Sequence, residues 1–330
     1  MFLRALHAIE NIKQKEDCPM IVEFALALLP FLAGMAVLAY SSKKAVEHTV
    51  SIASNLNISP LLIGLVVVSV GTDIPEIFNS IMSSAIGHGD INVGDSFGSI
   101  LVQITLVIGL TVLIGGTFKV RRDEIVVIGA CELLALIAAI SMVEKGYISR
   151  MNAVFLVASW PLLMIIIRNV LKKDYAVQPS DRKLRRHAIV AIAGYLGVML
   201  GAYIVINAVI TMANLLHVPE YFISFFAVAI GTSLPELAVD LTAVLKKQYE
   251  IAIGDAIGSC IVDAGLSIGI GPLIFPVAVS GKLAETTGLY ALLVSAVVIL
   301  TLALRRKVDR KAGIFFIALY GLSYGIAYLW

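Results

Sequence analysis

Ten long apolar runs occupy most of this 330-residue chain and limit what it can fold into. Runs such as 125–143 and 289–304 are continuous, whereas the strands of a membrane β-barrel would alternate apolar and polar residues. Each run approaches the roughly 20 residues that a helix needs to cross a bilayer. Only 15% of the residues are charged, against about 25% in a soluble domain. The sequence therefore predicts an all-α membrane protein.

The distribution of basic residues predicts how the chain is oriented. The predicted spans lie near residues 20–42, 61–86, 94–117, 124–143, 148–170, 187–210, 221–245, 251–275, 286–304 and 312–329. With ten spans, 19 of the 25 Lys and Arg residues collect on one side of the membrane, which leaves six on the other. The positive-inside rule then places both termini outside the cytoplasm.

The two halves of the chain carry the same motifs at a constant offset. Residues 71–76 read Gly-Thr-Asp-Ile-Pro-Glu, and residues 231–236 read Gly-Thr-Ser-Leu-Pro-Glu. Gly94-Asp95 and Gly98-Ser99 recur with the same offset as Gly254-Asp255 and Gly258-Ser259. Because each half has five spans, the second copy enters the membrane from the opposite face. Inverted repeats of this kind are typical of secondary transporters.

This organisation predicts four segments. Residues 1–19 would form an extracytoplasmic tail, residues 20–170 the first five-helix repeat, residues 171–186 a cytoplasmic linker, and residues 187–330 the second five-helix repeat. The tail lacks the apolar core and cleavage site of a signal peptide. We expect a ten-helix membrane protein built from two inverted five-helix repeats.

The repeated motif predicts a cation site in the middle of the membrane. Proline at position 75 or 235 removes a helical hydrogen bond and releases the carbonyl four residues earlier, at Gly71 or Gly231. Carbonyl and carboxylate oxygens are hard ligands that suit Ca²⁺ or Na⁺. Each motif glutamate lies one turn beyond the motif threonine, so the two share a helix face; these residues are Glu76, Thr72, Glu236 and Thr232.

The four central spans contain no Lys or Arg that could neutralise these glutamates. The partner spans add polar side chains at four-residue spacing, which places them on one helix face: Asp95, Ser99 and Gln103, and then Asp255, Ser259 and Asp263. Asp95 and Asp255 could contact the ion or cap their helices. Asp240 could line an exit path or lie at a solvated helix end.

These motifs resemble the alpha-repeats of the sodium/calcium exchanger family, within the cation/calcium antiporter superfamily. The resemblance covers residues 60–110 and 220–272. It implies that Glu76 and Glu236 are the central Ca²⁺ ligands and that transport proceeds by alternating access, with the first span of each half sliding past the core. It implies further Ca²⁺ and Na⁺ ligands at Thr72, Thr232, Ser99, Ser233, Ser259 and Asp263, and outlying Na⁺ sites at the carbonyls of Ser69 and Ala229.

Two positions depart from the family pattern. Asp73 stands where the family usually has serine, and Gln103 stands where asparagine is usual. Asp73 brings the carboxylates of the site to four, together with Glu76, Glu236 and Asp263, which exceeds the charge of one Ca²⁺ by two. The site would then hold additional Na⁺ or retain a proton. Exchange of Ca²⁺ for Na⁺ is therefore the leading hypothesis for the function. H⁺-coupled exchange of Ca²⁺ or another divalent cation remains the alternative.

A cation channel and an intramembrane protease rank lower. A channel does not explain two opposed polar motifs on broken helices. The aspartyl proteases of the membrane use Gly-x-Gly-Asp, whereas Asp95 and Asp255 follow Asn-Val-Gly and Ala-Ile-Gly. We therefore expect no enzyme activity and no cofactor, with Ca²⁺, Na⁺ or H⁺ as transported ions and the lipid bilayer as surroundings. No nucleic acid and no protein partner is indicated, and the short loops suit a prokaryotic inner membrane.

Overall fold

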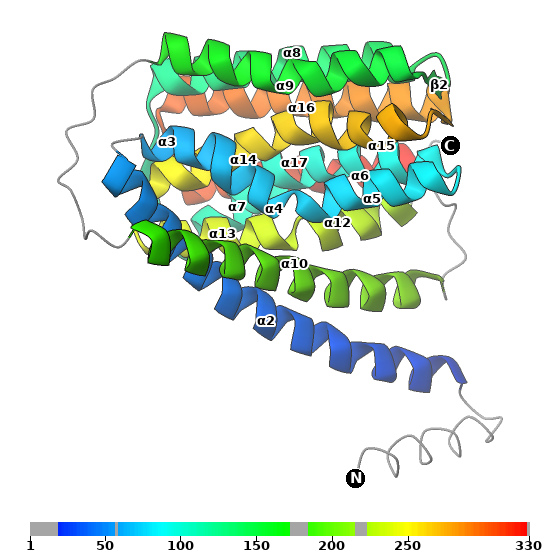
Figure 1. Cartoon of the computed structure of the whole chain (residues 1–330), viewed down its shortest axis with the longest axis horizontal. Coiled ribbons are helices and arrows are strands. Elements are labelled where there is room, and N and C mark those ends of the chain that lie inside the picture. Colours follow the sequence, from blue (N-terminus) through cyan, green and yellow to red (C-terminus); the bar gives the residue numbers. More distant parts are fainter. Residues whose placement is uncertain (1–18, 57–58, 172–183, 215–222, 329–330) are drawn as a thin grey trace.

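The computed structural model describes residues 19–56, 59–171, 184–214 and 223–328, which are almost entirely helical (Figure 1). The first half contains α2 (Pro19–Leu56), α3 (Pro60–Ile63), η1 (Gly64–Val68), α4 (Ser69–Thr72), α5 (Ile74–Ala85), α6 (Gly89–Leu101), η2 (Val102–Val107), α7 (Ile108–Gly115), β1 (Phe118–Lys119), α8 (Arg122–Val143), β2 (Tyr147–Ile148) and α9 (Arg150–Val170). The second half contains α10 (Leu184–Asn214), η3 (Ile223–Val228), α12 (Ala229–Thr232), α13 (Leu234–Leu245), α14 (Tyr249–Val262), η4 (Asp263–Ser267), α15 (Ile268–Ile274), β3 (Val277–Ala278), α16 (Gly281–Arg305), β4 (Lys307–Val308) and α17 (Arg310–Tyr328).

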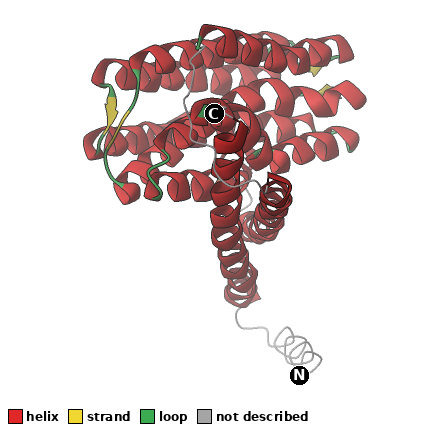
Figure 2. Cartoon of the chain, turned by 60° about the vertical axis from the view of Figure 1, so that its left-hand side comes forward, coloured by secondary structure: helices red, strands yellow, loops and turns green. Residues whose placement is uncertain are grey.

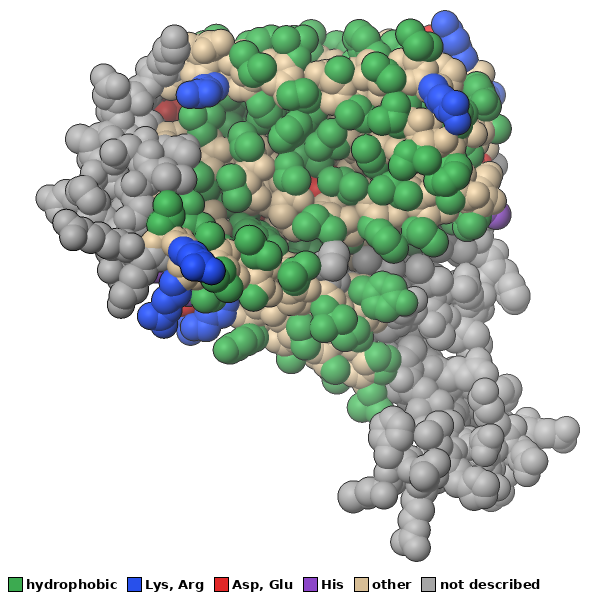
Figure 3. Space-filling view, in the orientation of Figure 1, with side chains coloured by type: hydrophobic (Ala, Val, Ile, Leu, Met, Phe, Trp, Pro, Cys, Tyr) green, Lys and Arg blue, Asp and Glu red, His purple; other side chains and the backbone are tan. Residues whose placement is uncertain are grey.

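The described helices form a membrane-type bundle. Five continuous helical stretches are long and apolar enough to cross a bilayer: Gly89–Gly115, Arg122–Val143, Arg150–Val170, Tyr249–Ile274 and Gly281–Arg305. A sixth is counted if the stretches Pro60–Thr72 and Ile74–Ala85, which meet at 44°, form one broken span. Apolar side chains cover the face of the molecule between its two ends, and Lys and Arg gather toward those ends (Figure 3).

Several predicted boundaries need correction. Helix α2 continues to Leu56, far past the predicted end at residue 42, because Ala45, Val46 and Thr49 on its extension are buried. Lys44 and Glu47, which pair at 3.4 Å, remain partly exposed on the same stretch. Helix α10 begins at Leu184, so the last residues of the predicted linker 171–186 are helical. The predicted tail and most of that linker lie outside the described residues.

Each break in the central helices lies two residues before a motif proline. The backbone turns at Asp73 (ψ 5°) and at Ser233 (ψ 5°), and α5 and α13 then begin with Pro75 and Pro235 in their first turn. Proline suits this position because a first-turn amide has no partner within its helix. The described chain contains four π-helical segments: η1 and η3 lie one short helix before the breaks, and η2 and η4 directly follow α6 and α14. Segments of this kind are frequent at functional sites.

Two short antiparallel strand pairs join the halves. Strand β1 pairs with β4 through Phe118 and Val308, and β2 pairs with β3 through Ile148 and Val277 (Figure 2). The second pair repeats the first with the roles of the two halves exchanged. The internal repeat of the sequence is thus matched by a repeat in the connections between helices.

The central helices are the most buried ones. In the most apolar windows of Gly89–Gly115 and Tyr249–Ile274, 78% of the residues are buried, against 28% for α9. Helices α2 and α10 pack side by side along one flank, away from α8, α9 and α16 (Figure 1). The polar motifs therefore lie in the interior of the bundle, where water is scarce.

Candidate cation-binding site

The two helix breaks bring acidic groups from both halves to one place. Glu76 lies in the first turn of α5 and Glu236 in the first turn of α13, and they are 1% and 0% exposed. Together with Asp73, each offers a carboxylate oxygen within 4.8 Å of the others. The prediction that the inverted motifs point toward a shared centre agrees with this geometry.

Many oxygen atoms of this cluster have no hydrogen-bond partner. Both carboxylate oxygens of Glu76, Glu236 and Asp263 are buried and unpartnered, as is Oδ2 of Asp73. The hydroxyl groups of Ser233 and Ser259 are also unpartnered. Buried carboxylates of this kind are costly unless a cation or proton neutralises them. The spans that carry them contain no Lys or Arg, so the arrangement suits a bound hard cation.

The motif threonines connect each half to the other. The Thr72 hydroxyl lies 3.3 Å from Asp255 Oδ1, and the Thr232 hydroxyl lies 3.0 Å from Asp95 Oδ1. Each threonine hydroxyl also lies 3.1 Å from the carbonyl oxygen four residues earlier in its own half. Each threonine therefore bridges its own helix to the aspartate of the opposite repeat.

The remaining predicted residues surround this centre. Ser99 and Thr232 share a hydroxyl contact of 3.2 Å, and the Gln103 amide donates to Asp73 Oδ1 at 3.4 Å. The carbonyls of Ser69 and Ala229, predicted as Na⁺ ligands, each accept the backbone amide four residues later, at 2.9 and 3.0 Å. The hydroxyls of Thr72 and Thr232 also lie 3.1 and 3.3 Å from these two carbonyl oxygens, so each carbonyl can turn its second lone pair to an ion only when the threonine donates to another acceptor.

Two alternatives for the aspartates are wrong. Asp95 and Asp255 each lie six residues inside their helices, which begin at Gly89 and Tyr249, so they do not cap a helix. Asp240 is 1% exposed and therefore does not lie at a solvated helix end. The capping alternative placed the helix starts too late because the glycines before these aspartates resemble helix-start signals.

Three buried polar features were not predicted from the sequence. The Asn79 amide donates to Asp95 Oδ2 at 2.6 Å, and the Asp240 and Asp255 side chains contact each other. Residue 79 follows Glu76 by almost one turn, and this spacing could have signalled the contact. Glu132 on α8 is also fully buried, beside Ser295 on α16, within the run 125–143 that the sequence predicts to be apolar.

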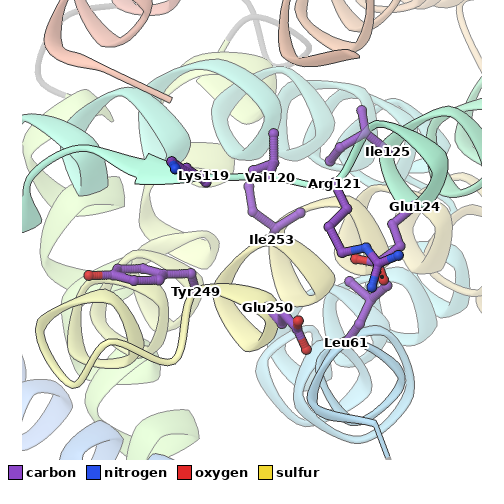
Figure 4. Close-up of a pocket in the computed structure, with 9 residues that line it drawn as sticks. All are labelled: Leu61, Lys119, Val120, Arg121, Glu124, Ile125, Tyr249, Glu250 and Ile253. Carbon is purple, nitrogen blue, oxygen red and sulfur yellow. Dashed lines mark ion pairs between the residues drawn. The ribbon is translucent and has the colours of Figure 1, made fainter. Parts of the chain in front are cut away.

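A surface pocket lies elsewhere, between α3, β1, α8 and α14. Leu61, Lys119, Val120, Arg121, Glu124, Ile125, Tyr249, Glu250 and Ile253 line it (Figure 4). Arg121 Nε lies 3.3 Å from Glu124 Oε1 within the pocket. It contains none of the predicted ion ligands, and its acidic and basic side chains balance.

Known proteins are similar to this chain in sequence and in architecture. The family described as "Sodium/calcium exchanger protein" matches residues 26–168 and 186–329. The putative antiporter CaxA of Alkalimonas amylolytica is 27% identical, with 91% of this chain and 98% of the relative covered. The sodium/calcium exchanger MaX1 of Methanosarcina acetivorans is 25% identical, with 88% and 95% covered.

A solved structure of the sodium-calcium exchanger NCX_Mj, soaked with Na⁺ and Sr²⁺, superposes with a TM-score of 0.76. It is 27% identical and covers 92% of this chain and 99% of its own. Both family matches coincide with the two halves that carry the repeated motifs. This chain is therefore an integral membrane protein that belongs to the sodium/calcium exchanger family.

Proposed function

We propose that this protein exchanges Ca²⁺ for Na⁺ across a membrane by alternating access. The observation that carries the proposal is the cluster of Asp73, Glu76 and Glu236, which draws carboxylates from both halves into one buried centre. The family membership supports a cation antiporter that takes Ca²⁺. The choice of Na⁺ as the counter-ion rests on the resemblance of the motifs and on the hard oxygen ligands around them.

The proposed architecture is ten spans in two inverted five-helix repeats. Helix bounds support it, since α5 and α13 begin and end at matching positions of the two repeats, as do α4 and α12. The basic residues favour an orientation with both termini outside the cytoplasm, in a prokaryotic inner membrane. In this arrangement the central site is reached from opposite sides by equivalent routes.

In the proposed mechanism, protein oxygens replace the water shell of the ion. Glu76 and Glu236 supply the charge that Ca²⁺ requires, while Thr72, Thr232, Ser99, Ser233, Ser259, Asp263 and Gln103 complete the Ca²⁺ and Na⁺ positions with the carbonyls of Ser69 and Ala229. The empty site carries uncompensated charge in an interior of low dielectric, so crossing without an ion is costly. Asp73 and Asp263 leave two negative charges beyond those that one Ca²⁺ neutralises, so additional Na⁺ or a retained proton completes the loaded site that can move from one side to the other.

Helices α2 and α10 are the elements that we propose to move. They pack against each other along one flank, and the Tyr195 ring of α10 lies against Gly71, where an added Cβ would approach within 2.9 Å. Thr49 on α2 holds the Tyr195 hydroxyl at 3.1 Å. Sliding of this pair would therefore act directly on the helix break beside Thr72.

Proton coupling is the second candidate, and Asp73 is the observation that favours it. The corresponding position in the second half is Ser233, so the first half has one additional carboxylate at its break. Asp73 Oδ2 is buried without a partner, next to Glu76 and Glu236. A proton on one of these groups would relieve the repulsion, and its release could drive Ca²⁺ exchange.

The test is Ca²⁺ uptake into liposomes that contain the purified protein. Radioactive Ca²⁺ would be supplied outside with an outward Na⁺ gradient, an outward H⁺ gradient, or neither. We expect uptake with the Na⁺ gradient only. Uptake driven by the H⁺ gradient would replace Na⁺ coupling with proton coupling, and equal uptake without any gradient would contradict antiport.

A further inference from the structure

We propose that Asp240 and Asp255 form a second Ca²⁺ position, beside the central site and toward the end of α13 that precedes Lys246. The inference rests on the proposed function and extends it by naming a place where Ca²⁺ is held before or after the central site. Asp240 lies four residues after Glu236 on α13, between Glu236 and that basic end. Asp255 lies on α14, which packs against α13.

The two carboxylates are buried together. Asp240 is 1% exposed and Asp255 is 0% exposed, and their side chains contact each other. Oδ1 of Asp240 and Oδ2 of Asp255 have no hydrogen-bond partner. Two adjacent carboxylates in an interior of low dielectric repel each other, and two negative charges match one Ca²⁺.

An unpartnered hydroxyl points to the same place. Ser259 is fully buried on α14, its Oγ has no hydrogen-bond partner, and its side chain lies next to Asp255. The Thr72 hydroxyl reaches Asp255 Oδ1 from the other half at 3.3 Å. These hydroxyl and carboxylate oxygens are of the type that binds Ca²⁺ with water completing the shell.

The helices that carry this pair and the adjoining motif provide no basic side chain to neutralise it. The sequences of α13 and α14 contain no Lys or Arg, and neither do those of α4 and α5. Lys246, directly after α13, instead binds Glu47 of α2 at 2.8 Å. A cation that enters the protein can therefore neutralise the charge of Asp240 and Asp255.

In the first half, the polar groups at the equivalent place form hydrogen bonds and need no ion. The positions that correspond to Asp240 and Asp255 are Ser80 and Asp95. Both oxygens of Asp95 have donors, from Thr232 at 3.0 Å and Asn79 at 2.6 Å. The Ser80 hydroxyl accepts the Gly271 amide at 3.1 Å. Of these four positions, only those in the second half leave acidic oxygens without a donor. The equivalent positions of the first half therefore serve as matched controls.

Equilibrium binding of radioactive Ca²⁺ to the purified full-length protein tests the site without transport. In the Glu76→Gln, Glu236→Gln background we expect about one Ca²⁺ to remain bound, and we expect Asp240→Ser to remove it. Asp240→Asn, which preserves side-chain shape, should have the same effect. The inference is overturned if the double variant binds no Ca²⁺, or if neither Asp240 substitution lowers its binding, or if Na⁺ rather than Ca²⁺ occupies the position.

Oriented vesicles then show whether the position serves transport. Asp240→Ser should raise the KM for Ca²⁺ at least tenfold from the side of Lys246 and leave the KM from the other side unchanged. Ser80→Asp combined with Asn79→Val should lower the KM from the opposite side. Equal changes from both sides would indicate a structural role and overturn the inference. Absence of gradient-driven uptake by the unmodified protein would instead contradict antiport and leave the binding result standing.

Discussion

The two halves of this protein use the same framework but distribute their charge differently. In both, a glutamate follows a proline-induced break, and a threonine reaches the aspartate of the opposite half. The first half places its additional carboxylate at the break, as Asp73, whereas the second places Ser233 there. The second half instead has Asp263 where the first has Gln103. The duplicated backbone sets the position of the site, and single substitutions set its charge.

Substitution of the two glutamates tests whether the two halves contribute equally to Ca²⁺ exchange. Glu76→Gln and Glu236→Gln should each reduce Ca²⁺ exchange by on the order of 100-fold or more, because loss of one central charge costs about 3 kcal/mol or more in a buried site. Ca²⁺ uptake into liposomes under a Na⁺ gradient measures this. A mild effect in one variant and complete loss in the other would show that the halves do not contribute equally.

The helix contacts at two equivalent glycines, Gly98 and Gly258, differ in how closely the neighbouring helix approaches. A Cβ on Gly98 would lie 2.2 Å from the Phe225 carbonyl, whereas one on Gly258 would lie 2.8 Å from the Cα of Leu65. Gly98→Ala should therefore destabilise the fold by about 1–3 kcal/mol, and Gly258→Ala by less. Thermal unfolding in detergent gives both values. Equal unfolding temperatures for the two variants would contradict the difference in packing.

Substitution of Asp73 tests whether the additional carboxylate of the first half makes transport depend on pH. If a proton on Asp73 must leave before Ca²⁺ binds, uptake should rise with pH by up to about tenfold per unit, the limit for one proton. Asp73→Ser makes the first half resemble the second and should flatten this profile. Uptake at several pH values under a fixed Na⁺ gradient provides the measurement. A variant with the profile of the unmodified protein would exclude Asp73 as the proton carrier.

The smallest expected effect concerns an ion pair that has no counterpart in the other repeat. Lys246 Nζ lies 2.8 Å from Glu47 Oε1, beyond the predicted span 20–42, and this hydrogen bond holds the pKa of Glu47 below its usual 4.5. The corresponding positions of the opposite halves are Ile86 and Asn207, which carry no charge.

Because the pKa of Glu47 is lowered in the folded protein, the pair stabilises the fold above pH 4.5 and loses its effect as the pH falls through the folded value. Both side chains are about one-third exposed, so Lys246→Ala should cost about 0–1 kcal/mol at neutral pH. Unfolding measured at pH 7 and at an acid pH below the folded pKa of Glu47 checks this. A cost that persists at the lower pH would mean that Lys246 acts through packing.

Much of the candidate site was accessible from the repeated motifs. The constant offset between the two copies predicted that Glu76 and Glu236 meet, and the prolines predicted the breaks at Asp73 and Ser233. The π-helical segments were not predicted, because an additional residue in a turn leaves no clear mark on an apolar run. The length of α2 was also missed, since charged residues at a helix end read as a loop when only hydropathy is considered.

The contacts of the aspartates show where prediction from sequence ends. Asp95 and Asp255 occupy equivalent positions in equivalent motifs, yet Asp95 has donors for both oxygens and Asp255 has an oxygen without one. The cause is a neighbour on another helix: Asn79 reaches Asp95, whereas Asp240 reaches Asp255. Similar motifs thus have different electrostatic surroundings.

The sequence by itself determined the membrane-type helices, the duplication and the residues that carry charge into the interior. These features depend on hydropathy, proline and spacing, which act within one segment of chain. The tertiary structure decided which buried oxygens are matched by donors and which have no hydrogen-bond partner. That outcome depends on packing between helices far apart in the chain, because a buried polar group is satisfied only by the neighbour that the fold places beside it.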